Sequence, residues 1–495
     1  MGGSVNLASV AALAPELLIL ILAVIVLFYD KALKPQEKRK MGLMTAWGSF
    51  IIILVTLAIW LFYDDLGQDP VSLWGGMIRY DQVSLVFTLM FLIALLVTAL
   101  ISLDVKGLQK GEYYALLMTA TIGFIFMGAS YDLIMMYIAL ETASISLYIL
   151  AAFTKGVYRS NEAGMKYFIY GAFVSAVMLY GLSYIYGLTQ ETNIAAVAQE
   201  IANALASGLD PAVLVATALV VVGFGFKITA VPFHFWAPDV YEGAPTPVTG
   251  LVSTASKAAG FAIFLRVLAT GVFGSPDPSS DWWAMLVAMC IVTMTLGNLL
   301  AIQQKNIKRM LAYSSIAQAG YAMIGLVTLT AEGSGATMFF LIFYLVSNIA
   351  AFGVIIVLSN LTGSDEINDL KGLSRRSPTL ALAMMFALLS LGGIPPTAGF
   401  FGKFFVFRAT IDVGLWWLAA VGIINAFIAL YYYLSIIKVM YLYRSDDEDI
   451  PIPISRAAKL ALGLTIFGIF YLGIFAERAF EWTREAAVDL YAFIG

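Results

Sequence analysis

Two lysines, a histidine and a glutamate stand in stretches of sequence that are otherwise apolar. Lys227 and Lys257 flank a Pro-rich segment that carries the only histidine, His234, and Glu141 lies in an apolar run upstream. In hydrocarbon such groups are costly unless they face protein or water. A lysine whose pKa is brought near neutrality by its surroundings can take up and release protons. These residues therefore indicate proton transfer at buried positions.

A third lysine, Lys403, follows a second helix-breaking segment, GGIPP at 392–396. Gly399 and Gly402 precede it, but a phosphate-binding loop requires different glycine spacing and a Ser or Thr directly after the lysine, where this chain has Phe404. We expect Lys403 to lie in the outer half of a broken helix, as the exit of an ion path.

The positions of these residues suggest depth and pairing. Glu141 lies about nine residues into one apolar run and Lys257 about eleven residues into another, which places both near mid-membrane at about 1.5 Å per residue. Lys227 is the natural ionic partner of Glu141. The alternative for each is a structural charge between packed helices, and for His234 a hydrogen bond at the Pro232 break instead of proton relay.

Polar residues between the lysines form a candidate water-holding ladder, although each could equally be a helix-packing hydrogen bond. Its members are Ser314, Ser315, Gln318, Asn348 and Asn425. Arg266 and Lys438 are predicted to snorkel from span ends. Lys166 is predicted to snorkel or to join the Glu141 pair.

Composition identifies the class of protein. Of the 495 residues, 61% are hydrophobic and 12% charged, and the mean hydropathy is +0.88. Soluble domains are about half apolar and a quarter charged. The chain is therefore predicted to be an all-α polytopic membrane protein. The single cysteine, Cys290, excludes a disulfide framework or a Cys-ligated cluster within the chain.

Apolar runs of about 20 residues predict about fourteen transmembrane spans. They lie near 10–29, 42–63, 80–103, 113–129, 132–153, 162–186, 212–235, 246–271, 281–303, 309–329, 335–360, 378–408, 414–442 and 456–475. One alternate set of loops holds most of the Lys and Arg residues, whereas the other set and the two tails hold only Arg79, Arg408, Arg478 and Arg484. Because positive loops stay inside, both termini are predicted to lie outside.

The seventh and twelfth spans contain the two breaks, and an odd offset of five spans reverses helix direction. Two inverted five-helix repeats, spans 4–8 and 9–13, are therefore predicted, as in ion-coupled transporters. The expected divisions of a single transmembrane domain, 1–495, are three N-terminal helices (1–103), the repeats (113–271 and 281–442), and a last helix with tail (456–495). The tail suits an interfacial amphipathic helix, a contact with a neighbour or a solvated helix.

Neither a dinucleotide fingerprint nor an ATP motif occurs, so the energy must come from an ion gradient or a partner. The run FKITAVPFHFWAPDVYEGAPTPVTGLVSTASK at 226–257 resembles the signature of the antiporter-like membrane subunits of respiratory complex I, NADH–quinone oxidoreductase. NIKRMLAYSSIAQAGY at 306–321 and GGIPPTAGFFGKFFVF at 392–407 are similar to the subunit N (ND subunit two) branch of that family. The likeness covers nearly the whole chain.

The resemblance implies redox-driven proton pumping, with Glu141, Lys227, Lys257 and Lys403 matching the family's charged helix positions. It implies no cofactor in this chain. NADH, FMN, iron–sulfur clusters and quinone would belong to partner subunits, and the partners would be other membrane subunits, including neighbouring antiporter-like ones, and the lipid bilayer, without nucleic acid.

We expect a bacterial inner membrane location. The same family includes subunits of multisubunit cation/proton antiporters and of the photosynthetic NDH-type complex of thylakoid membranes, so an antiporter without electron transfer remains an alternative. A third is a scaffold that conducts nothing.

Overall fold

The computed structural model describes residues 7–62, 71–274, 280–445 and 450–491. Apolar runs without interior proline form helices, which satisfy their own backbone groups inside a membrane. The helices are α1 (Leu7–Ala12), α2 (Ala14–Ala32), α3 (Arg39–Phe62), α5 (Gln82–Ser102), α6 (Gly111–Ala129), α7 (Leu133–Ala151), α8 (Tyr158–Thr189), α9 (Ile194–Ala206), α10 (Asp210–Ile228), α11 (Trp236–Gly243), α12 (Thr246–Leu251), α13 (Lys257–Thr270), α14 (Asp281–Ile302), α15 (Ile307–Leu326), α16 (Ala331–Thr362), α17 (Leu373–Arg376), α18 (Pro378–Gly392), α19 (Ala398–Asp412), α20 (Trp416–Leu442), α21 (Arg456–Ile474) and α22 (Ala476–Tyr491).

The remaining described elements are short. They are the 3-10 turns η1 (Pro35–Glu37), η2 (Trp74–Gly76) and η4 (Ile367–Leu370), the π turn η3 (Val252–Ser256), and the antiparallel strands β1 (Val71–Leu73) and β2 (Ile78–Tyr80). The hairpin was not predicted from sequence.

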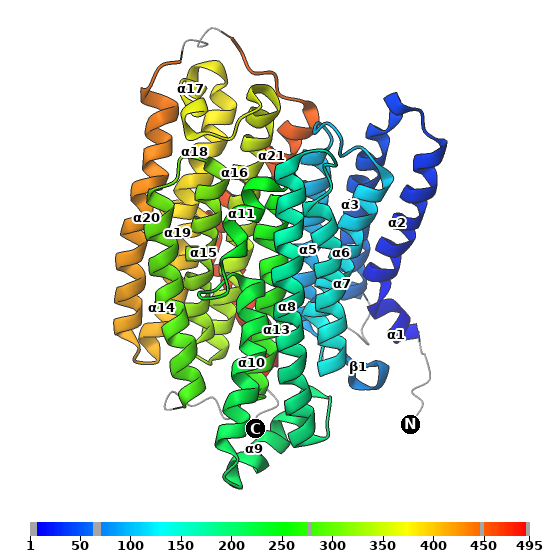
Figure 1. Ribbon diagram of the computed structural model, residues 1–495, viewed down its shortest axis with the longest axis vertical. Helices are drawn as coiled ribbons and strands as arrows, with labels where there is room; N and C mark the ends of the chain where they lie inside the picture. The colour runs from blue at the N-terminus through cyan, green and yellow to red at the C-terminus, as the bar shows by residue number, and fades with distance from the viewer. Residues whose placement is uncertain (1–6, 63–70, 275–279, 446–449, 492–495) are drawn as a thin grey trace.

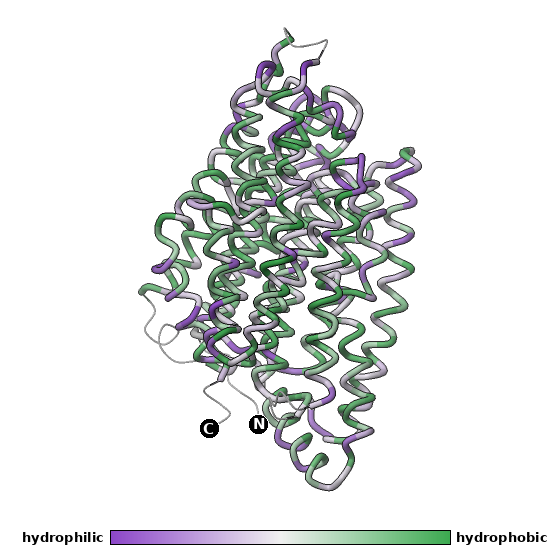
Figure 2. The backbone as a smooth tube through the Cα atoms, turned by 90° about the vertical axis from the view of Figure 1, so that its left-hand side faces the viewer, coloured by the Kyte–Doolittle hydropathy of each residue, from purple (hydrophilic) through white to green (hydrophobic). Residues whose placement is uncertain are grey.

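The long helices run side by side along one axis of the molecule (Figure 1). Figure 2 shows hydrophobic residues along most of the helix lengths and hydrophilic residues gathered toward the ends. Among the described residues, 11 helices are long and apolar enough to cross a membrane. The all-α polytopic fold is therefore confirmed.

The predicted spans near 10–29, 309–329 and 378–408 also contain helices, namely α2, α15, and α18 with α19. These lie outside the group of 11. The exact number of crossings therefore stays a prediction.

Both predicted breaks are present. α10 ends at Ile228, before Pro232, and its C-cap Thr229 has a φ of 63°. α18 ends at Gly392, before Pro395 and Pro396, and its C-cap Gly393 has a φ of 85°. Proline lacks an N–H and clashes with the preceding turn, so neither helix can continue. The two half-helices thus end alike, while the inverted repeat and the proposed divisions of the chain remain predictions.

Two segments outside the predicted spans fold as amphipathic helices. α9, within the stretch near 187–211, is capped by Asn193 and buries Ile194, Val197 and Ile201. The tail forms α22, which packs against α16 and α5 and buries Phe480 and Leu490. The tail thus packs on the chain's own helices, an arrangement that was not among the alternatives predicted from the sequence.

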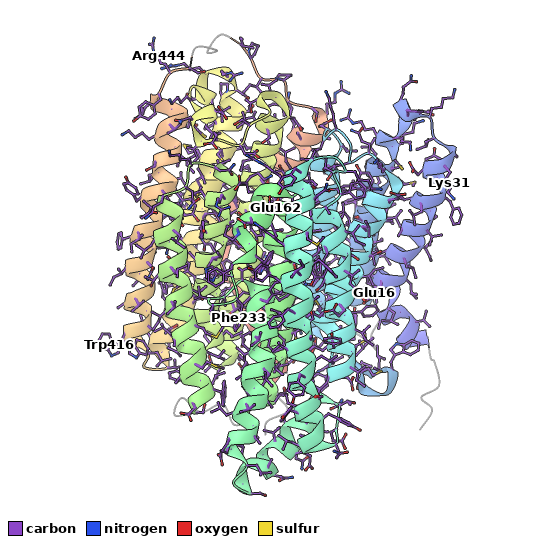
Figure 3. All side chains as sticks on the ribbon, in the orientation of Figure 1. Glu16, Lys31, Glu162, Phe233, Trp416 and Arg444 are labelled. Carbon is purple, nitrogen blue, oxygen red and sulfur yellow. The ribbon has the colours of Figure 1, made fainter. Side chains whose placement is uncertain are left out.

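The charged loops divide between the two ends of the bundle. Lys31 and Arg444 lie toward one end, here called the lysine-rich end, and Trp416 lies toward the other (Figure 3). The β1–β2 hairpin lies at that other end, here called the hairpin end (Figure 1). There Arg79 of β2 donates a hydrogen bond of 3.1 Å to the carbonyl of Asp489 in α22.

A buried ion pair fastens the hairpin end. Arg266 of α13 donates two hydrogen bonds, of 2.8 and 2.7 Å, to the carboxylate of Asp81, and both side chains are 0% exposed. A third bond, of 2.7 Å, runs from Arg266 to the carbonyl of Gly128 in α6. Arg79 lies 3.3 Å from Asp81. The prediction that Arg266 snorkels is therefore wrong, because its guanidinium is fully paired inside the protein.

Removing the negative charge of this cluster should destabilise the fold. Asp81→Asn keeps an oxygen that can cap α5 at Ser84 but leaves two arginines without their carboxylate. We expect a loss of about 3–5 kcal/mol in the free energy of unfolding, measured by denaturant titration of the full chain in detergent micelles.

Arg408→Met is the control, because the Arg408–Asp412 pair spans 3.8 Å with both side chains about half exposed. It should change stability by no more than about 0.5 kcal/mol. Equal losses in the two variants would contradict a special role for the buried cluster.

Candidate functional site

Lys227 lies in the last turn of α10, directly before the first break. Its Nζ donates a hydrogen bond of 2.9 Å to Ser144 of α7, whose hydroxyl donates 2.6 Å to the carbonyl of Leu140. Its stem packs on Gly260, where a Cβ would stand 3.0 Å from the Lys227 Cγ. The glycine thus allows the lysine to lie flat against α13, one turn beyond Lys257.

Glu141 lies one turn before Ser144 on the same helix and is half-buried. Its carboxylate accepts a hydrogen bond of 2.5 Å from Ser175 of α8. Among the described ion pairs within 4.0 Å, none joins Glu141 to Lys227. The direct pair expected from the sequence is thus replaced by an arrangement in which Ser144, rather than Glu141, contacts the lysine.

Lys257 is fully buried at the point where the π turn η3 passes into α13. Its Nζ donates to the carbonyl of Ser315 in α15 and, at 2.6 Å, to the hydroxyl of the same residue. The ammonium also lies 5.8 Å from the centre of the Tyr344 ring. A π turn widens the helix and often occurs at functional sites. It was not predicted from the sequence.

Lys403 of α19 folds back onto the end of α18. Its Nζ donates hydrogen bonds of 3.0 Å to the carbonyls of Leu391 and Gly392 and lies 4.9 Å from the centre of the Tyr321 ring. The last carbonyls of a helix have no intrahelical partner and carry partial negative charge. The broken helix therefore supplies the lysine with its oxygens.

The surroundings of Lys257 and Lys403 meet at two adjacent residues of α15, Ser315, which holds Lys257, and Ser314, from which hydrogen bonds continue toward Lys403. Ser314, adjacent to Ser315, lies 2.5 Å from the Tyr433 hydroxyl. Gln318 donates to that hydroxyl at 3.2 Å and to the carbonyl of Leu391 at 2.9 Å. Leu391 is the same carbonyl that Lys403 contacts. Three members of the predicted ladder thus lie in one connected group.

The other two ladder residues belong to neighbouring networks. Asn348 donates to Ser253 at 2.7 Å and to the Tyr344 hydroxyl at 3.1 Å, beside Lys257. The Asn298 amide donates to the Asn425 side chain at 3.3 Å and to the Tyr321 hydroxyl at 3.0 Å, beside Lys403. The tyrosines of these networks were not predicted from the sequence, because a tyrosine in an apolar helix can equally pack in a core without a polar role. The position of these tyrosines in helices that also carry Asn, Gln and Ser could have indicated a polar network.

Aromatic side chains fill the space near Lys227 and Lys257. Tyr167 stacks on Trp236 with ring centres 4.4 Å apart, and Tyr148 contacts Tyr167 edge-on at 4.8 Å. The Tyr241 hydroxyl lies 3.4 Å from that of Ser315, the partner of Lys257. The rings of Tyr241 and Tyr344 thus border the site of Lys257.

His234 is buried in the first break, and its neighbour Phe233 lies near the middle of the long axis (Figure 3). Its Nδ1 has no hydrogen-bond partner among the described residues. The imidazole makes a ring contact with Phe235 at 4.4 Å. Its relay role stays a prediction, since no described hydrogen bond links the ring to Lys227 or Lys257.

Lys166 does not join Glu141. Its Nζ lies 2.8 Å from Glu162 and 2.6 Å from Asp239 of α11, and Asp239 also pairs with Arg309 at 2.7 Å. These ion pairs hold the half-helix after the first break against α8 and α15. Among the described residues, no group of three or more His, Cys, Asp or Glu side chains could hold a metal ion.

The family model described as NADH:quinone oxidoreductase/Mrp antiporter, TM, matches residues 130–429. NADH-quinone oxidoreductase subunit N of Moorella thermoacetica is 45% identical over 421 residues, which cover 84% of this chain and 87% of that protein. The subunit N of Desulforamulus reducens is 40% identical over 480 residues, with 96% and 98% covered. A chain in the structure of respiratory complex I from Thermus thermophilus with bound aureothin superposes with a TM-score of 0.76 at 30% identity, covering 94% of this chain and 98% of that one.

The fold and its buried lysines define a polytopic membrane protein of the antiporter-like type. The chain belongs to the NADH:quinone oxidoreductase/Mrp antiporter transmembrane family. The resemblance inferred from the sequence motifs is thereby confirmed.

Close packing at the second break gives a test of this geometry. A Cβ at Gly399 would stand 1.7 Å from the backbone oxygen of Ser390. Gly399→Ala should therefore push the two half-helices apart and destabilise the chain by about 1–3 kcal/mol. The readout is again denaturant titration in micelles.

The matched control is Gly463→Ala in α21, where nothing lies within 4 Å of the added Cβ. That variant should be neutral or up to about 1 kcal/mol more stable, since alanine favours helix. If the Gly399→Ala variant is as stable as the parent, the half-helices α18 and α19 are not held in close contact at Gly399 and Ser390.

Proposed function

We propose that this chain is a proton-translocating membrane subunit of NADH–quinone oxidoreductase, coupled to electron transfer in other subunits. NADH, FMN, iron–sulfur clusters and quinone would be bound by those partners, and neighbouring antiporter-like subunits would flank the chain. The proposed location is the bacterial inner membrane, with both termini outside. The names and high identity of the relatives support this proposal.

One observation carries the proposal: three buried lysines are held only by neutral groups. Lys227, Lys257 and Lys403 are 1–4% exposed. Their hydrogen bonds go to hydroxyls and carbonyls, and none of the described ion pairs includes them. A lysine fixed by a carboxylate is held in its charged form, whereas one held by neutral oxygens can exist with or without its extra proton.

In the proposed mechanism, Lys227 receives a proton from the inner side near His234. The proton then passes laterally to Lys257 and leaves past Lys403. Attraction by the Glu141 carboxylate favours the protonated form of Lys227, so a change in their separation drives uptake or release. Moving one charge against 100 mV costs about 2.3 kcal/mol, which electrostatic changes of this kind can supply.

The test is quinone-reductase activity and proton uptake, measured side by side in membranes that contain the assembled complex. Lys227→Ala and Glu141→Ala should each lower proton uptake by about tenfold or more, because each removes a group of the path or its controlling charge. Assembly should be unaffected.

Lys438→Ala is the matched control, since Lys438 also lies in a long apolar helix but is exposed and rests 5.7 Å from the Tyr443 ring. It should pump normally. Normal proton uptake in Lys227→Ala would indicate that the chain is a scaffold that conducts no protons. If the complex copurifies without any iron–sulfur absorbance, the chain is instead a subunit of a cation/proton antiporter.

A further inference from the structure

A hollow with a volume of about 800 Å³ opens on the flank formed by α2, α6, α7 and α8. Clefts of about 300–1,000 Å³ are the usual size of small-molecule sites. Leu27, Leu116, Ile149 and Phe168 form apolar walls. At the back of the hollow α8 packs closely on the end of α7: at Gly164, an added Cβ would stand 2.4 Å from the Ala152 methyl.

The residues that line the hollow follow the helix axes inward from one end of the bundle. Its lining begins at Glu112, Lys155 and Asn161, at the lysine-rich ends of their helices, and continues to Thr119 and Tyr148. From Glu112 to Thr119 is about 10 Å along the helix axis. The site therefore starts at the membrane surface and extends into the hydrocarbon, as an acyl chain does.

Cations predominate around the mouth. Lys155 lines it, and the Lys110 ammonium lies 5.6 Å from the ring of Phe153, another lining residue. Lys31 follows Leu27 by one helical turn. All three lysines are exposed, and none forms an ion pair among the described residues. Glu112 is the only acidic residue of the lining.

We propose that this hollow binds an anionic phospholipid of the surrounding membrane. The acyl chain lies against the apolar walls, and the headgroup phosphate contacts Lys110 and Lys155. Basic pockets between transmembrane helices on the inner side attract anionic headgroups. The site is independent of the proposed proton path. Its deep end nevertheless touches Tyr148, which packs on Tyr167 near Lys227.

Native mass spectrometry of the detergent-purified full chain tests the headgroup contact. The probes are phosphatidylglycerol and phosphatidylethanolamine with identical acyl chains. We expect tighter binding of phosphatidylglycerol, and a loss of about 30-fold in that preference for Lys110→Gln with Lys155→Gln, since each lysine contributes about fivefold. Lys305→Gln with Lys371→Gln removes the same charge from other loops at the lysine-rich end and should leave the preference intact.

A second pair of variants tests the chain contact. Ile149→Trp places a larger ring over the hollow and should weaken both lipids alike, whereas Ile138→Trp, on the same helix but outside the lining, should weaken neither; both isoleucines are about half exposed. Equal binding of the two lipids by the parent, or an effect of the control lysines equal to that of Lys110 and Lys155, would overturn the proposal. So would photocrosslinking in the assembled complex that joins Ile149 to a neighbouring subunit and to no lipid.

Discussion

The structure depends on how backbone groups are satisfied where a helix stops at membrane depth. A helix end leaves carbonyls without partners, and hydrocarbon provides no water to bind them. At the end of α18 the carbonyls of Leu391 and Gly392 are taken by Lys403 and Gln318. The helix break and the lysine thus satisfy each other's hydrogen-bonding groups, because the carbonyls need donors and the ammonium needs acceptor oxygens.

At all three lysine sites the ammonium donates to neutral oxygens, but the residues that supply these acceptors differ. Ser144 serves Lys227, Ser315 serves Lys257 and a helix end serves Lys403. None of the ion pairs among the described residues includes these lysines, and Glu141 lies one helical turn from Ser144, the partner of Lys227. The electrostatic surroundings of Lys227, Lys257 and Lys403 therefore differ. Lys227 has a carboxylate nearby, whereas Lys403 is held by the carbonyl dipoles at the end of α18.

Much of this could be predicted from the sequence, because lipid imposes strict rules. The lengths of the apolar runs predicted the helices, and Pro232, Pro395 and Pro396 predicted where two of them break. The partners of the charges could not be predicted in the same way. Arg266 was expected to reach water because its distance from a span end was known and the fold around Asp81 was not. The π turn before Lys257 has no local sequence signal, since VSTAS also suits an ordinary helix.

The Arg266 cluster has a mechanical consequence. Through Asp81, Gly128 and Arg79 it joins α13 to α5, α6 and, by way of Asp489, to α22. The helix that carries Lys257 is thus anchored at one extremity, while its other end passes through the wider π turn. The cluster therefore fixes the position of α13 along its axis, and with it the depth of Lys257, relative to α5, α6 and α22.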